Sequence, residues 1–390
     1  MVQLVPTAAA ANGRPLGGAA FGWLTGLALL LAVSLGAVDG SSMGAIVPAY
    51  AVLGLALAVV ARVPLGPVDR WTVALVLLFL LWMAASTALA GRGSRGLGRV
   101  GQMATVLLPL LLLLPLAGPA ERTVRRLIGA VAAVAAIVAA ALGLELLLDA
   151  PVAQALWSQN ATRYNRGLAC LVILVWPLAA AAGPRLALPL LVAVGFMAGA
   201  SESATARLAF AVGSVVALAA LVLPRVTVAA VAAGSGLLLL AAPVVFHGIE
   251  WVMPLTREIP ASWIERLDIW REATTVIAGA PWTGHGLRMM RDVAPLPPVM
   301  SAYTHLHNVL LQLWLDLGFV GAAVAFALAL RLLLLSRRLD AAAVPFAAAA
   351  WVAALVTVMS GFEVWSEAML GMFAFAAFLF AASARAAPGR

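Results

Sequence analysis

Long uninterrupted apolar runs constrain this chain more than any other feature. Breaking the sequence at charges, prolines and glycines leaves about a dozen such runs, each near the ~20 residues that an α-helix needs to cross a bilayer. Hydrophobic residues make up 64% of the 390 residues and charged residues only 10%, whereas a soluble domain carries about 25% charged residues. A soluble globular protein is therefore excluded. The chain is predicted to be an all-α, polytopic transmembrane helical bundle with about 12 spans.

The predicted organisation has three parts. Residues 1–246 hold spans 1–9, residues 247–306 form a large loop with short helices, and residues 307–390 hold spans 10–12. The first span is expected to be retained rather than cleaved as a signal peptide, because no clear cleavage site precedes Asp39. The spans are expected near Gly18–Ala37, Ala45–Ala61, Trp71–Ala90, Val100–Leu116, Val124–Leu148, Gly167–Ala182, Leu186–Gly199, Leu208–Leu223, Val226–Phe246, His307–Leu335, Ala341–Ser360 and Phe362–Ala382.

The basic residues predict the orientation of the chain in the membrane. The net charge is +8, and every basic residue is an arginine. Most arginines of the short loops fall on one side if the N-terminus is cytoplasmic, as the positive-inside rule requires, so the long loop is expected to face the periplasm. This membrane rule accounts for most of the basic residues, and no nucleic-acid partner is expected. A single cysteine, Cys170, excludes an intramolecular disulfide and a cysteine-rich metal site.

Several arginines in short outer segments oppose that rule and are informative for this reason. One interpretation is interfacial anchoring or ion pairing with outer carboxylates. The other is a convergent cationic site for an anionic lipid headgroup or a pyrophosphate, since guanidinium groups suit phosphate oxygens and stay charged in a partly dry site. These arginines are Arg92, Arg95 and Arg99 after the third span, Arg163 and Arg166 after the fifth, and Arg207 after the seventh.

The long loop holds all four histidines within it or at its edge. Residues Ser262–Ala273 have helical spacing, with Trp263 and Trp270 on one face and Ser262 as a predicted N-cap. The two tryptophans fit a helix lying at the membrane interface, and they also fit stacking against sugar rings. A turn-rich stretch, Gly279–Gly286, follows this helix.

The loop closes with Thr304–Asn308, which leads into a long apolar helix. A neutral histidine at such a helix start can accept a proton from an attacking hydroxyl near neutral pH. His305 and His307 are alternatively plain interfacial residues or metal ligands, although no nearby acidic cluster has convincing ligand spacing. Asn308 is expected to cap the helix or to orient the histidine, and Asp316 to pair with an arginine or to lie exposed at the interface.

A specific motif begins at this turn. His307-Asn308, nine further residues and Gly318-Phe319-Val320-Gly321 match the pattern His-[Asn/Ser/Gln]-x9-Gly-x-x-[Gly/Thr/Tyr] of bacterial O-antigen ligases. The segment from Arg266 to Trp270, and Asn165-Arg166-Gly167 at the start of the sixth span, also resemble the wider O-antigen ligase and polymerase superfamily.

The resemblance implies a GT-C-like inverting membrane glycosyltransferase without a cofactor or metal. It would transfer undecaprenyl-pyrophosphate-linked O-antigen polysaccharide to a hydroxyl of lipid A–core, at an active site on the periplasmic side of the bacterial inner membrane. His307 would act as the general base, and arginines would stabilise the departing pyrophosphate. The expected catalytic residues are His307, Arg266 and Arg166. The expected substrate-binding residues are Arg207, Arg288, Arg271, Arg163, Asn308, His305 and Trp270.

Other functions remain open at this point. A polymerase of the same superfamily would extend the lipid-linked glycan itself, and a protein O-glycosylation enzyme would use a similar donor. A transporter or flippase of lipid-linked glycans should instead show ionisable groups in mid-span and broken helices around a central path. The polar residues here cluster on the outer rim and in one loop, which favours an enzyme. Besides donor and acceptor, the expected partners are inner-membrane lipids.

Overall fold

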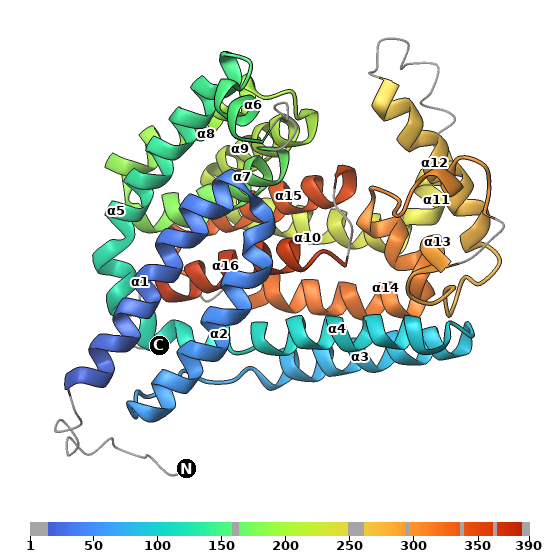
Figure 1. The fold of residues 1–390 in the computed structure, drawn as a ribbon, viewed down its shortest axis with the longest axis horizontal. Coiled ribbons are helices and arrows are strands. Elements are labelled where there is room, and N and C mark those ends of the chain that lie inside the picture. Colours follow the sequence, from blue (N-terminus) through green and yellow to red (C-terminus); the bar gives the residue numbers. More distant parts are fainter. Residues whose placement is uncertain are drawn as a thin grey trace.

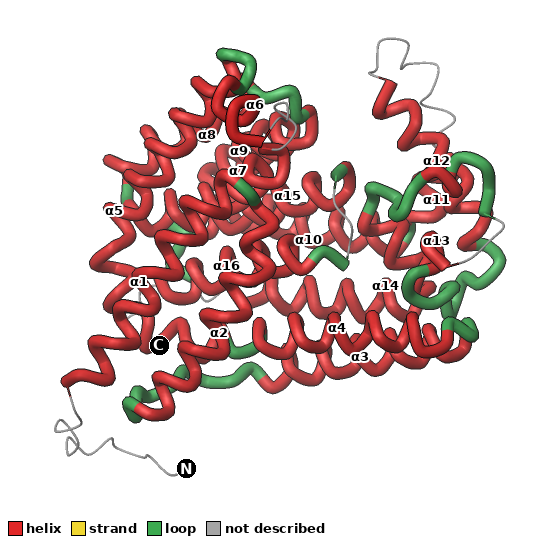
Figure 2. Tube along the Cα trace, viewed as in Figure 1, coloured by secondary structure: helices red, strands yellow, loops and turns green. Residues whose placement is uncertain are grey.

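The computed structural model describes residues 15–157, 164–248, 261–292, 296–335, 339–361 and 365–383. Within these ranges all regular structure is helical (Figures 1 and 2). Seven helical segments are long and apolar enough to cross a membrane, and four shorter apolar helices accompany them. The predicted all-α polytopic membrane class is therefore confirmed.

The long helices follow the predicted spans closely. Helices are expected for such runs, since the bilayer core offers no water to the backbone and each N–H and C=O must bond within the chain. The main helices are α1 (Pro15–Val38), α2 (Met43–Val60), α3 (Arg70–Leu89), α4 (Gly93–Leu110), α5 (Leu113–Leu147), α7 (Asn165–Ala182), α8 (Pro184–Ala200), α9 (Ala204–Val222), α10 (Pro224–Leu240), α14 (Val309–Leu335), α15 (Val344–Ser360) and α16 (Glu367–Ser383). Short helices are η1 (Gly40–Ser42), α6 (Pro151–Trp157), α11 (Ala242–His247), α12 (Ala261–Ile277), α13 (Met289–Asp292) and η5 (Met300–Ala302).

Two expected spans are interrupted in the structure. The span predicted over residues 100–116 ends as α4 at Leu110, and α5 begins at Leu113. Pro109 lies at the end of one helix and Pro115 in the first turn of the next, where its missing N–H costs nothing. The span predicted over residues 226–246 is likewise divided into α10 and α11, with a proline in the first turn of α11.

Helix α7 forms the centre of the bundle. Every residue from Gly167 to Ala179 is buried, and α7 packs against α1, α5, α8, α9, α15 and α16. Its first turn lies directly against the end of α1, because a Cβ on Gly167 would collide with the carbonyl of Ala37. Small residues at this contact therefore place Arg166 beside η1.

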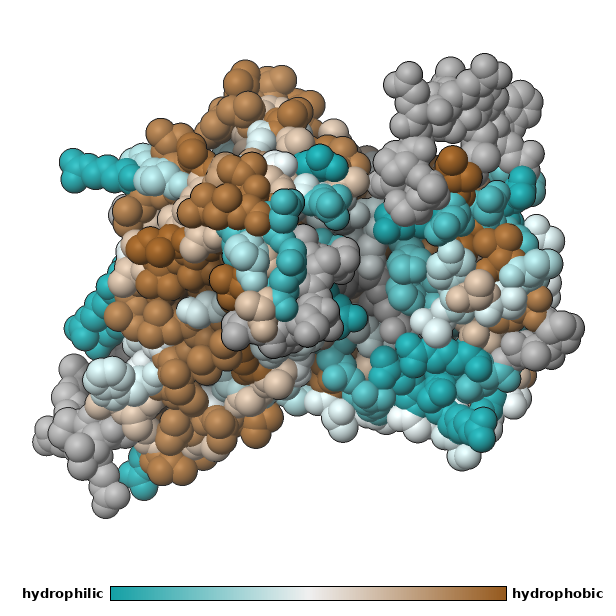
Figure 3. All heavy atoms as spheres, turned by 45° about the horizontal axis from the view of Figure 1, so that its top comes forward, coloured by the Kyte–Doolittle hydropathy of each residue, from teal (hydrophilic) through white to brown (hydrophobic). Residues whose placement is uncertain are grey.

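Apolar and polar surfaces are separated along the molecule. Large apolar side chains such as Trp23 and Val60 are more than 80% exposed on the outer helices, as expected where lipid is the solvent. Figure 3 shows apolar surface over the part that carries α1, α2, α5 and α8, and more hydrophilic surface at the end that carries α12 and α13.

Helix α14 links the histidine turn to the start of α3. Its first residue follows the His305–His307 turn, and Arg331 in its last turns forms an ion pair with Asp69. The same carboxylate caps α3 by accepting a hydrogen bond of 3.0 Å from the N–H of Thr72. The histidine turn and this ion pair therefore lie at opposite ends of one helix.

The long loop contains the helix that its periodicity predicts. Helix α12 covers the expected segment, and the predicted face is buried at Trp270, together with Leu267 and Thr274. The helix begins at Ala261, one residue before the predicted N-cap Ser262, and the side chains of Ser262 and Trp263 lie outside the described residues.

Candidate functional site

The turn before α14 brings two histidines into contact. The ring centroids of His305 and His307 lie 4.0 Å apart, and the ring of Tyr303 meets that of His307 edge-on at 6.0 Å. His307 has a φ of 53°, a left-handed conformation that residues with a side chain rarely adopt. Such strain persists only where surrounding contacts enforce it, and it concentrates at functional sites.

The backbone between the two histidines is held from both sides. Leu306 is fully buried. Its N–H donates to Oε1 of Gln312 at 3.0 Å, and its carbonyl accepts from Nε1 of Trp270 at 2.8 Å. One partner comes from α14 and the other from α12, so two helices together determine the position of the turn.

A buried carboxylate lies one helical turn further along α14. Asp316 is completely buried, which shows that the expectation of an exposed interfacial residue is wrong. Its Oδ2 accepts hydrogen bonds from Nε2 of Gln312 at 2.9 Å and from Nε1 of Trp365 at 2.7 Å. Asn308 is also buried, and its Oδ1 accepts from the backbone N–H of Leu310 at 3.0 Å. The predicted capping role of Asn308 is therefore confirmed.

The structure explains why the sequence motif requires a glycine at position 318. Gly318 has a φ of 64° and interrupts the helical conformation of α14. A Cβ at this position would collide with the backbone of Trp282 in the turn-rich segment Pro281–Gly286. That segment replaces helical hydrogen bonds lost at the kink: for example, the N–H of His285 donates to the carbonyl of Leu315 at 2.8 Å. The segment thus supports α14 rather than forming a phosphate-binding loop.

Three arginines from separate parts of the chain act on the histidine pair. Arg166 begins α7, Arg266 lies on α12 and Arg291 on α13. Burial is the largest cause that lowers the pKa of His305, and the positive charges of Arg291, Arg166 and Arg266 lower it further. Positive charge thus gathers around rings that are themselves neutral at pH 7.

The ring of His307 is neutral at pH 7. Burial of its ring, followed by the neighbouring His305 and Arg266, lowers its pKa to about 4. Its Nδ1 is buried and has no hydrogen-bond partner among the described residues. A neutral, partnerless nitrogen is a suitable acceptor for a substrate proton.

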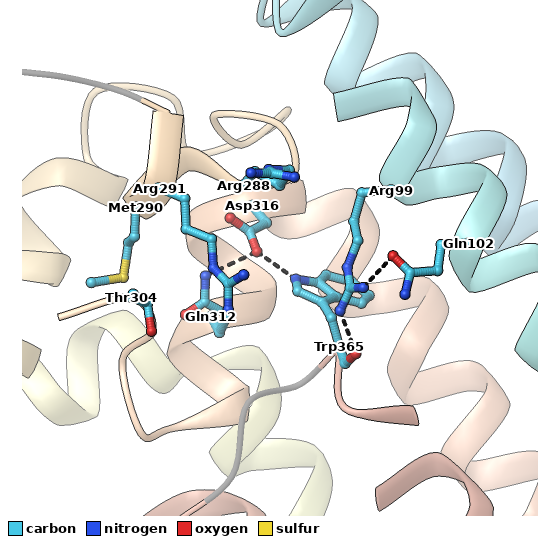
Figure 4. Close-up of a pocket in the computed structure, with 9 residues that line it drawn as sticks. All are labelled: Arg99, Gln102, Arg288, Met290, Arg291, Thr304, Gln312, Asp316 and Trp365. Carbon is cyan, nitrogen blue, oxygen red and sulfur yellow. Dashed lines mark hydrogen bonds between the residues drawn. The ribbon is translucent and has the colours of Figure 1, made fainter. Parts of the chain in front are cut away.

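A cavity of about 160 Å³ adjoins the histidine turn. Figure 4 shows Arg99 on one side of it, Arg291 on the other, and Arg288 and Asp316 between them. Arg99 also donates to the carbonyl of Trp365 at 2.8 Å. The cavity is lined by Arg99, Gln102, Arg288, Met290, Arg291, Thr304, Gln312, Asp316 and Trp365. Its lining combines several guanidinium groups with one carboxylate, which suits a polar, oxygen-rich ligand.

The structure brings some of the predicted site residues together. His305 and His307 are in contact at the turn, the positive charges of Arg166 and Arg266 lower the pKa of His305, and Arg288 lines the adjoining cavity.

The remaining predicted residues lie elsewhere or contact their own chain. Arg271 is half exposed and pairs with Asp268 at 3.3 Å. Arg207 is exposed in the first turn of α9. Trp270 and Asn308 are buried and bond to backbone atoms as described above, and Arg163 lies outside the described residues.

Residues that the sequence-based site omits also line the cavity. Gln312 and Asp316 are polar residues inside an apolar run, and this placement is a signal that could have identified them. Arg291 and Trp365 give no such signal, because only the fold brings their segments to the turn.

The other two histidines have structural contacts. Nδ1 of His247 lies 3.2 Å from Oγ1 of Thr274, and Nε2 of His285 lies 2.9 Å from the carbonyl of Val276. Both therefore attach neighbouring segments to α12. Among the residues that the structure describes, no group of three or more His, Cys, Asp or Glu side chains could hold a metal ion.

A known family model matches part of this chain. Residues 189–326 match the model of the family described as O-antigen ligase. This range runs from α8 into α14 and includes Arg266, His305 and His307. The match supports membership in the O-antigen ligase superfamily. The match also supports a membrane glycosyltransferase activity of the ligase or polymerase type, with lipid-linked glycans as the general class of substrate. A search of curated proteins finds no match to the chain.

Proposed function

We propose that this protein transfers an O-antigen polysaccharide from undecaprenyl pyrophosphate to a hydroxyl of lipid A–core, with inversion at the anomeric carbon. The single observation that carries the proposal is the His305–His307 turn. A strained, partly buried, neutral histidine lies in a turn whose Thr304 lines a polar cavity, and arginines from α7, α12 and α13 act on its neighbour His305. The reaction belongs in the bacterial inner membrane, with this turn on the periplasmic side.

His307 is the proposed general base. It takes the proton of the acceptor hydroxyl as the oxygen attacks the anomeric carbon of the donor's first sugar. The bond from that carbon to the pyrophosphate oxygen breaks, and its electron pair leaves with the undecaprenyl pyrophosphate. The proton then passes from His307 to water. A base in this role typically contributes about 10²–10⁴-fold to the rate.

Arginines supply the proposed stabilisation of the leaving group. Arg266, Arg166 and Arg291 surround the histidines, and Arg288 lines the adjoining cavity. Guanidinium groups bind phosphate oxygens with two parallel hydrogen bonds and stay charged when partly buried. Stabilising charge as it develops is usually the largest catalytic contribution, so these groups can perform the role without a metal.

The acceptor is tested by offering two acceptors in one assay. Purified protein receives lipid-linked polysaccharide together with lipid A–core, and the products are separated on a gel and weighed by mass spectrometry. Glycan attached to lipid A–core supports the ligase. Elongation of the lipid-linked donor, with lipid A–core unmodified, would show a polymerase instead. Loss of transport across the membrane in mutants, without glycosyl transfer to any acceptor, would indicate a flippase.

A further inference from the structure

We infer that Gln312 and Asp316 are positioning residues that hold the histidine turn in the geometry required for glycosyl transfer. The inference rests on the proposed role of His307 as the base. These residues act on His307 indirectly, because they hold the backbone of Leu306, the residue before it.

A continuous chain of hydrogen bonds connects these groups. The carboxylate of Asp316 accepts from Nε2 of Gln312 at 2.9 Å, which leaves Oε1 of the same amide directed at the N–H of Leu306, 3.0 Å away. Trp365 donates to the same carboxylate oxygen at 2.7 Å. The amide of Gln312 is therefore held in one orientation, since a flipped amide would present an N–H to the N–H of Leu306.

The sequence places these residues on one stripe of α14. Asn308, Gln312 and Asp316 are spaced four residues apart, so they lie above one another on a single helical face. Each is at least 95% buried, whereas the residues between them are apolar. Asn308 caps the helix and the other two extend the polar stripe inward, toward the cavity. A carboxylate is costly at such a position, which makes a functional reason for it the default.

The turn needs this support because its conformation is strained. His307 adopts its left-handed φ of 53° while its neighbour Leu306 is bonded at both its N–H and its carbonyl. Removing the acceptor of a buried N–H leaves that group unsatisfied, so the turn is expected to shift until the N–H finds water. A displacement of about 1 Å at a reacting group can cost on the order of 10²-fold in rate.

The decisive variant is Gln312→Met, which keeps the length of the side chain and removes both hydrogen bonds. We expect kcat to fall about 10–100-fold. The KM for the lipid-linked donor should change by less than about threefold, because the arginines that bind the donor remain. The pH at which kcat/KM falls on the acid side should rise, because a displaced ring is less buried and escapes His305 and Arg266, the groups that now lower its pKa. Tyr303 and the backbone of Gly361 also face this ring and are unchanged in the variant.

A matched control removes a different hydrogen bond from the same helix. Trp314 donates from Nε1 to the carbonyl of Leu239 at 2.8 Å, away from the histidine turn. Trp314→Phe should leave kcat and the acid limb as in the wild type. If Gln312→Met behaves like this control once rates are corrected for folded protein, the inference is overturned. An unchanged kcat with a raised KM would overturn it as well, because Gln312 would then be a substrate contact in the cavity.

Asp316 provides the second, independent arm. Asp316→Asn keeps an oxygen that can accept from Gln312 and Trp365, whereas Asp316→Leu removes it. We expect the asparagine variant to keep at least about tenfold more activity than the leucine variant; equal losses would refute the positioning role. His307→Ala, measured in parallel, distinguishes failure of the proposed base from failure of the positioning role. An active His307→Ala refutes the proposed base, while an inactive one with normal Gln312→Met refutes only the present inference.

Discussion

Binding of the anionic donor should raise the pKa of His307. In the free protein this pKa is lowered to about 4 by burial and by the nearby His305 and Arg266. A base so weakly basic is poorly matched to proton abstraction near pH 7. A pyrophosphate seated on the arginines would offset their charge and favour the protonated ring.

The expected size follows from the charges around the turn. One negative charge about 7 Å from the ring, at an effective dielectric constant of about 20, stabilises the imidazolium by roughly 2 kcal/mol and raises its pKa by about 1.5–2. His307 would then titrate near pH 6 in the donor complex. The donor thus both provides the sugar and strengthens the base.

Initial rates measured between about pH 3.5 and about pH 8 cover the pKa of His307 both in the free protein and in the donor complex. The acid limb of kcat/KM reports the free protein and that of kcat reports the complex. We expect the acid limb of kcat/KM near pH 4 and the acid limb of kcat about 1.5–2 pH units higher. Arg266→Gln removes one of the lowering charges, so its kcat/KM limb should move to higher pH, while Arg125→Gln, in an ion pair with Glu121, should not change it. Coincident limbs in kcat and kcat/KM would refute the reasoning.

Four further outcomes follow from individual contacts. Gly318→Ala should lower the free energy of unfolding by at least about 1–3 kcal/mol, because its positive φ is strained and its Cβ would collide with the backbone of Trp282. Gly234→Ala, where no atom lies within 4 Å of an added Cβ, should instead stabilise its helix slightly; equal effects in calorimetry would contradict this. Trp270→Phe loses its bond to the Leu306 carbonyl, so stability should fall by about 1 kcal/mol and kcat with it, and unchanged kcat would contradict the positioning of the turn. Asp69→Ala should cost about 1 kcal/mol of helix capping without altering the activity of folded protein, since it lies at the far end of α14. Stability should decline as the pH falls from about 6.5 to about 4, because the unfolded chain protonates first where the folded pKa of His307 is lowered; a smaller decline is expected in His307→Gln, and an identical melting profile would exclude this contribution.

The sequence predicts the fold well because the bilayer leaves few choices. A run of about 20 apolar residues can be buried in lipid only as a helix, and each predicted span has a helical counterpart in the structure. Each of the two divided spans has a proline beside the break, Pro109 and Pro243, which interrupts a run that hydropathy alone treats as continuous. Helix α5, in contrast, continues through the loop predicted over residues 117–123.

The site is only partly visible in the sequence. The motif identifies His307, and the spacing to Gly318 reflects a kink that only glycine accommodates. The hydrogen bonds that hold the turn come from Trp270 and Gln312, and Trp365 joins them through Asp316. These partners lie on segments far apart in the chain, so no local pattern could have assembled them.

The most direct test of the account is transfer by purified His307→Ala in the presence of EDTA, under single-turnover conditions with lipid-linked polysaccharide and lipid A–core. His247→Gln provides the control, because His247 contacts Thr274 and lies outside the turn. We expect wild type and His247→Gln to transfer glycan to lipid A–core, and His307→Ala to be slower by about 10²–10⁴-fold with unchanged folding. Transfer by His307→Ala at the wild-type rate would contradict the assignment of His307 as the base.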